Sequence, residues 1–125
     1  MKTEKTITQK ITSYESACKD LKVNPKNLPI VNKLPKEEQK RIIAHYKLTV
    51  IIKALNEGWF PNWKDKNEWK YYPYFIFEGN AFLYYYCYAR SLFNFGLGSP
   101  LYYKSSNLAE YAGKKFKKLY NDYMK

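Results

Sequence analysis

The most constraining feature of this sequence is a helical pattern that begins at Pro35 and stops at Gly58. Proline suits the first position of a helix because its missing N–H would have no partner there, and glycine is a common helix stop. A helix of this length, at about 1.5 Å per residue, is roughly 33 Å long and spans a domain of this size. Its expected core face carries Ile42, Ile43, Tyr46, Val50, Ala54 and Leu55, widened by Leu48, Ile51 and Ile52.

An aromatic run, residues 59–77, follows this helix and holds all three tryptophans. The pattern predicts a strand over residues 69–77, which Pro73 weakens to an edge or a bulge. Gly79-Asn80 then predicts a hairpin turn into a second strand over residues 81–89. Neither face of the second strand is polar, so both faces are covered or one face binds a partner. The two faces carry Phe82, Tyr84, Tyr86 and Tyr88, and Leu83, Tyr85, Cys87 and Ala89.

A closing helix is predicted after residues 105–107, which offer Ser and Asn as caps. Its core stripe carries Leu108, Tyr111, Ala112, Phe116, Leu119, Tyr120 and Tyr123. Gly113 lies inside this helix, where glycine costs about 1 kcal/mol against alanine, so we expect a close approach to another element there.

The N-terminal part is less regular. Residues 1–12 are expected to form a flexible tail, with an edge strand as the alternative. Ser13 predicts the cap of a short helix over residues 14–21, and a proline-rich extended connector follows. The order of elements predicts an α+β fold: two main helices and a short N-terminal helix packed on a small antiparallel sheet, with residues 13–125 as a single domain.

The chain is strongly basic: 22 Lys and Arg against 11 acidic residues give a formal net charge of +11 over 125 residues. Such a charge favours an anionic partner, which is nucleic acid, an acidic protein face or a membrane surface. The alternative is that a Lys-, Asn- and Tyr-rich composition reflects an AT-rich genome. With two distant cysteines, no signal-peptide pattern and no apolar stretch long enough to span a bilayer, we expect a cytoplasmic protein.

No motif indicates an enzyme. The lone histidine, His45, has no acidic residue three or four positions away, so it reads as a helix residue rather than a base or ligand. Cys18 and Cys87 lack the spacing of a zinc site, and no phosphate-binding or nucleophile motif is present. We therefore expect neither a catalytic residue, nor a metal, nor a cofactor.

Two sets of residues are candidates for binding. Lysines interleave with aromatic residues after the long helix and lie on the outer side of the closing helix, a mixture that suits phosphates and unstacked bases. The alternative is a tryptophan core under a solvated lysine face. The tyrosines of the second strand would favour a protein interface if the closing helix does not cover them. The candidates are Lys64, Lys66, Lys70, Tyr84, Tyr86, Tyr88, Arg90, Lys114, Lys117 and Lys118.

The blocks ALNEGWFPNW and SSNLAEYAGKKF, with LPKEEQKRIIAHYKLTVIIK and NEWKYYPYF, carry a resemblance over roughly residues 12–124. They resemble a family of small, mostly uncharacterised bacteriophage and prophage proteins, which offers no catalytic residues to transfer. The sequence departs from that pattern between Glu78 and Gly98, where Tyr and Phe replace more polar residues. The phage setting and small size imply a host-directed effector, most concretely an inhibitor of an RNA-guided (CRISPR) defence nuclease.

Two hypotheses follow for function. The first is a non-enzymatic anti-defence protein that binds RNA or a ribonucleoprotein and blocks it by occlusion. The second is a virion or packaging accessory protein whose Tyr-rich surface is a subunit interface. Oligomeric state stays open.

Overall fold

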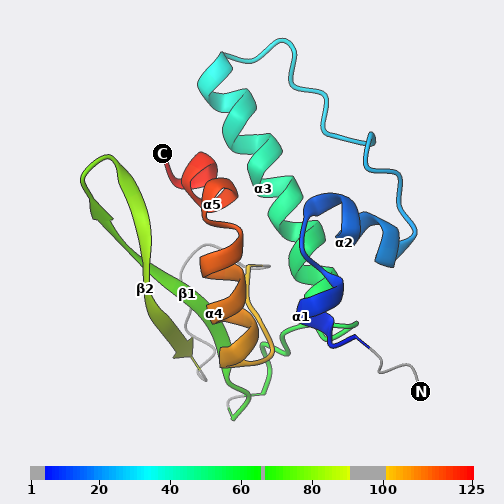
Figure 1. Cartoon of the computed structure of the whole chain (residues 1–125), viewed down its shortest axis with the longest axis vertical. Coiled ribbons are helices and arrows are strands. Elements are labelled where there is room, and N and C mark those ends of the chain that lie inside the picture. Colours follow the sequence, from blue (N-terminus) through cyan, green and yellow to red (C-terminus); the bar gives the residue numbers. More distant parts are fainter. Residues whose placement is uncertain (1–4, 66, 91–100) are drawn as a thin grey trace.

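The computed structural model describes residues 5–65, 67–90 and 101–125, and the side chains of residues 86–90 also lie outside the description. Figure 1 shows three layers: a β-hairpin, then α4 and α5, then α3 with α2 beside it. This arrangement confirms the α+β class. The elements are α1 (Ile7–Lys10), α2 (Tyr14–Leu21), α3 (Lys36–Leu55), β1 (Lys70–Glu78), β2 (Ala81–Arg90), α4 (Ser106–Lys115) and α5 (Lys117–Met124).

Helix α3 lies where the sequence predicts it, directly after Pro35, but its two halves differ in burial. Apart from Ala44, the fully covered residues lie in the C-terminal half, whereas Ile42, Ile43 and Tyr46 are only partly buried. Figure 1 shows the reason: α2 lies beside the C-terminal half, and the N-terminal half projects past it toward the connector. The buried residues are Ala44, Leu48, Val50, Ile51, Ile52, Ala54 and Leu55.

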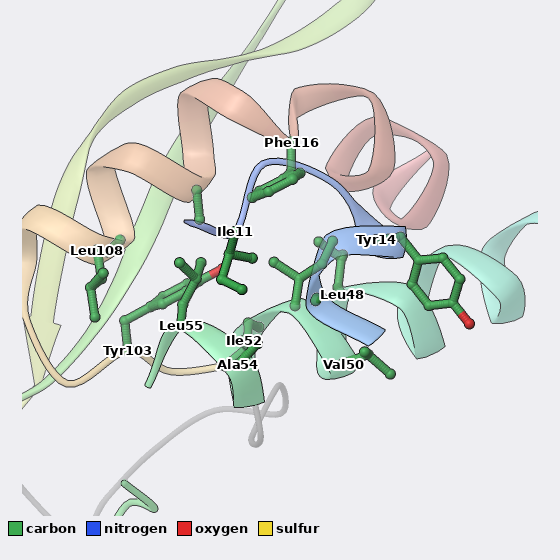
Figure 2. Close-up of a cluster of buried hydrophobic side chains, with 14 of the residues drawn as sticks. Ile11, Tyr14, Leu48, Val50, Ile52, Ala54, Leu55, Tyr103, Leu108 and Phe116 are labelled. Atoms are coloured by element: carbon green, nitrogen blue, oxygen red, sulfur yellow. The ribbon is translucent and has the colours of Figure 1, made fainter. Parts of the chain in front are cut away.

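The expectation of a flexible tail over residues 1–12 is wrong for its second half. Thr6 caps helix α1 with its side chain, and Ile11 is 0% exposed. Figure 2 shows Ile11 inside the apolar cluster, near Leu55 and Phe116. The Tyr111 hydroxyl also donates a hydrogen bond to the Ile11 carbonyl oxygen at 2.6 Å. One isoleucine therefore fixes this segment, because burial removes its whole side chain from water.

Strands β1 and β2 form an antiparallel hairpin whose turn contains Gly79 at φ +65°. Tyr74 lies opposite Tyr86 and Phe75 lies opposite Tyr84, so Tyr85 is an extra residue in β2 and makes a bulge. Pro73, which we expected at an edge or bulge, lies inside β1 one residue before this irregularity.

One face of the hairpin lies against α4 and α5. The Phe75 and Tyr120 rings are 4.9 Å apart. The Asn121 side chain accepts a hydrogen bond from the Phe82 backbone N–H at 2.6 Å and donates one to its carbonyl oxygen at 2.8 Å. Asn121 thus serves both backbone hydrogen-bonding groups of Phe82, as a neighbouring strand would.

Tyr103 connects three elements. Its backbone exchanges two hydrogen bonds with that of Tyr71, at 2.7 and 3.0 Å. Its hydroxyl lies 2.9 Å from the Tyr120 hydroxyl in the core. On either side of it, the Asn56 side chain donates to the Tyr102 carbonyl oxygen and accepts from the Lys104 N–H. Over the described residues, the pairing of this segment with β1 is a single bridge.

The closing helix is two helices, not the single one we expected. Phe116 interrupts it with φ −108° and ψ 31°, and α5 starts immediately afterwards. The interruption contains neither Gly nor Pro, so no local signal predicted it. Its position sends Phe116 into the core and still lets Tyr120 pack on the sheet.

The close approach expected at Gly113 is confirmed. A β-carbon built on Gly113 would lie 2.5 Å from Tyr84 Cδ1 and 2.8 Å from Pro73 Cβ. Both distances are shorter than van der Waals contact, and the proline ring cannot move aside alone. Glycine at this position therefore lets α4 lie directly on the hairpin.

We predict that Gly113→Ala destabilises the fold. The better helix propensity of alanine contributes about 1 kcal/mol, but overpacking against Pro73 and Tyr84 costs about 1–3 kcal/mol. We expect a net loss of about 1 kcal/mol in the free energy of unfolding, measured by urea denaturation. Lys115→Ala on the exposed side of α4 is the control and should change it by less than about 0.5 kcal/mol. A more stable Gly113→Ala protein would contradict the close approach.

Candidate nucleic-acid interface

Four lysines from two helices line a hollow between α3 and α5. Lys36, Lys40 and Lys47 come from α3 and Lys118 comes from α5, around a volume of about 570 Å³. We call this hollow the lysine groove. Its floor is aliphatic, with Ile43, Ala44 and Leu119 among its lining residues. Cations of separate elements meet here on one surface.

The helical repeat of α3 places its three lysines on one face. Lys40 lies four residues after Lys36, and Lys47 lies eleven residues after Lys36. These spacings correspond to about one and three turns at 3.6 residues per turn. The row is therefore about 16 Å long at 1.5 Å per residue. Lys36 and Lys40 are exposed and Lys47 is half-buried, so this face is open to solvent mainly at its N-terminal end.

Asp122 is the acidic residue that lines the groove. Its carboxylate lies 3.4 Å from Lys40 Nζ and 3.0 Å from Lys118 Nζ. Lys47 Nζ lies 5.1 Å from the centre of the Tyr14 ring of α2, a cation–π distance that fixes this side chain. Four lysines against one aspartate leave the groove with a net charge of +3.

Of the lysines predicted on the closing helix, the structure brings Lys118 into the groove. Lys117 is exposed on α5. Lys114 lies on α4, 2.8 Å from Glu110 Oε1 and 5.6 Å from the Tyr84 ring centre. The Glu110 hydrogen bond and charge raise the pKa of Lys114. The predicted trio is thus divided between two helices rather than forming one patch.

The prediction that Lys70 contacts a ligand is wrong. Its side chain is 0% exposed, and its ammonium donates to the carbonyl oxygens of Asn62, Asp65 and Glu68 at 2.9–3.2 Å. Its Nζ also lies 3.2 Å from Glu68 Oε1 and 5.2 Å from the Trp63 ring centre. Lys70 holds the loop between α3 and β1 together. A buried charge needs this many partners.

The remaining predicted residues do not form one site. Lys64 is exposed in the same loop, and Lys66 lies outside the described residues. Tyr84 is half-buried against Gly113 of α4, so the alternative that the closing helix covers its face is confirmed at this residue. The side chains of Tyr86, Tyr88 and Arg90 lie outside the description.

The opposite side of the hairpin is open over the described residues. Tyr74, Ile76, Leu83 and Tyr85 are 37–60% exposed, and the Tyr74 and Tyr85 rings lie 6.3 Å apart. We call these four residues the hairpin outer face. Exposed apolar residues that gather in one place are typical of interaction sites.

The described residues contain no cluster of three or more metal-ligating side chains of His, Cys, Asp and Glu. His45 is half-buried, with its ring 5.2 Å from that of Tyr123. In the described part of the chain, no helix combines the length and the apolar character that crossing a membrane requires.

Comparison of the chain with protein-family models, curated proteins and solved structures gives no match.

The sequence did not indicate Lys36, Lys40 and Lys47 as binding residues. Their helical spacing was visible, but their position opposite Lys118 depends on how α5 crosses α3. The α3–α5 contact and the break at Phe116 are both tertiary features.

We predict that Lys70→Met destabilises the fold by about 3 kcal/mol, because it leaves three carbonyl oxygens and the Glu68 carboxylate without their cation. Urea denaturation followed by tryptophan fluorescence measures this loss. Lys64→Met, in the same loop and exposed, is the matched control and should be nearly neutral. Equal stability of the two variants would show that Lys70 does not organise the loop.

Proposed function

We propose that this chain is a non-enzymatic phage or prophage accessory protein that binds RNA, or the RNA-bearing surface of a ribonucleoprotein, through the lysine groove. The observation that carries the proposal is the meeting of four lysines from α3 and α5 around one hollow. The net charge of +11 supports it, because a basic chain attracts polyanions over long range.

The lining of the groove indicates which part of a nucleic acid it would contact. Among the residues that the structure describes, the groove is lined by its four lysines, Asp122, Gln39 and aliphatic residues, and by no aromatic residue. Lysines bind phosphates as point charges, whereas bases are held by stacking on aromatic rings. We therefore propose contact with the phosphodiester backbone, with little dependence on base sequence.

In its most concrete form, the proposal is inhibition of an RNA-guided (CRISPR) nuclease in the cytoplasm of the host cell. The protein would act by occlusion, because its lysines would occupy the path of phosphates that the nuclease needs. The phage-family resemblance and the basic charge support this form.

We predict that replacing the four groove lysines by glutamine weakens binding to a short oligouridylate at least tenfold at low salt. The association constant falls as salt rises, and each lysine lost should make this plot of log K against log salt less steep by about 0.7. The total reduction in steepness is about 3. Fluorescence anisotropy measures both quantities.

The control for this experiment replaces four exposed lysines elsewhere, Lys26, Lys53, Lys64 and Lys115, by glutamine. It removes the same charge but leaves the groove intact. If both quadruple variants lose the same affinity, net charge and not the groove binds RNA. If the unchanged protein binds neither RNA nor a nuclease–guide complex, the proposal fails.

The second candidate function, a virion or packaging accessory role, is favoured by the hairpin outer face. Two copies of one apolar face can pair about a two-fold axis. We predict that Leu83→Ser with Tyr85→Ser abolishes self-association in sedimentation velocity and leaves oligouridylate binding unchanged. Phe60→Ser, at an exposed aromatic residue away from this face, is the control. A monomer at all concentrations would contradict the subunit-interface role.

A further inference from the structure

Asp122 occupies an unusual position for an acidic residue. It lies in the last turn of α5, where the helix dipole disfavours a negative charge. Its side chain is 16% exposed, whereas those of its partners Lys40 and Lys118 are 62% and 85% exposed. Each of its two oxygens faces one ammonium, one from α3 and one from α5.

These ion pairs contribute little to folding. Both lysines are mostly in water, and exposed pairs of this kind add little stability on average. Core contacts already hold α5, since Tyr120 hydrogen-bonds Tyr103 and packs on Phe75. The main effect of Asp122 is therefore local: it cancels one of the four positive charges of the groove and attracts two of its ammonium groups.

We propose that Asp122 is an internal counter-anion that limits how tightly the lysine groove holds a phosphodiester backbone. A phosphate that contacts Lys40 or Lys118 must draw the ammonium from the carboxylate and sit close to that carboxylate. Like charges repel at such distances even in a medium of high dielectric constant. The inference rests on the proposed function and adds a residue that keeps binding weak and reversible.

The direct test is Asp122→Asn, which keeps the size of the side chain and removes its charge. The matched control is Glu110→Gln, which makes the same change of net charge at a helical ion pair, Glu110 with Lys114, outside the groove. The probe is a fluorescein-labelled oligouridylate of about 12 nucleotides, within the range of single-strand site sizes. Anisotropy titrations at several salt concentrations give Kd and its salt dependence.

We expect Asp122→Asn to bind about three- to tenfold more tightly than the unchanged protein, with a steeper salt dependence. The Kd of Glu110→Gln should differ from that of the unchanged protein by less than about twofold. Asp122→Ser, a second variant without the charge, should shift Kd in the same direction, and thermal unfolding by circular dichroism verifies that both variants are folded.

If Asp122→Asn binds like Glu110→Gln, or more weakly than the unchanged protein, the counter-anion role is overturned. In that case the proposed function still stands when the groove glutamine variant loses binding. If neither the unchanged protein nor Asp122→Asn binds the oligonucleotide, both fail. Binding by Asp122→Asn alone would support the inference.

Discussion

The fold depends on how Tyr103 is held. Its backbone pairs with Tyr71 of β1, its hydroxyl meets that of Tyr120 of α5, and Asn56 at the end of α3 holds its neighbours. Burial raises the pKa of both Tyr103 and Tyr120, so both hydroxyls stay protonated. Buried polar groups that are fully paired favour one arrangement over others. This residue thereby fixes the sheet, α3 and α5 relative to one another.

The lysine groove is a consequence of that arrangement. Tyr120 anchors the sheet side of α5, so Lys118, Leu119 and Asp122 line the hollow that α5 forms with α3. Because α2 covers only the C-terminal half of α3, Lys36 and Lys40 of the other half are exposed, whereas Lys47 packs on Tyr14 of α2. The lysines therefore lie together at the edge of the core, and the groove forms only when α5 packs against α3.

The aromatic residues fall into two groups: those packed in the interior and those exposed on the surface. Tyr103, Tyr120 and Phe116 are buried, and Phe75 and Tyr84 pack between the hairpin and the helices. Tyr74 and Tyr85 lie on the other side and are exposed. Tyrosine suits both places because its ring can be buried while its hydroxyl finds a partner or water.

The sequence by itself determined the class of the fold, the position of α3, the hairpin turn at Gly79 and the close approach at Gly113. Each of these follows from local chemistry: a proline start, a helical period, a turn glycine and a glycine where a side chain was expected. Only the tertiary structure decided that Ile11 is buried, that Lys70 is an internal cation and that Lys118 faces the lysines of α3. The physical reason is that burial and charge pairing depend on residues distant in the chain. The sequence does not distinguish a lysine that three carbonyl oxygens surround from one that water surrounds.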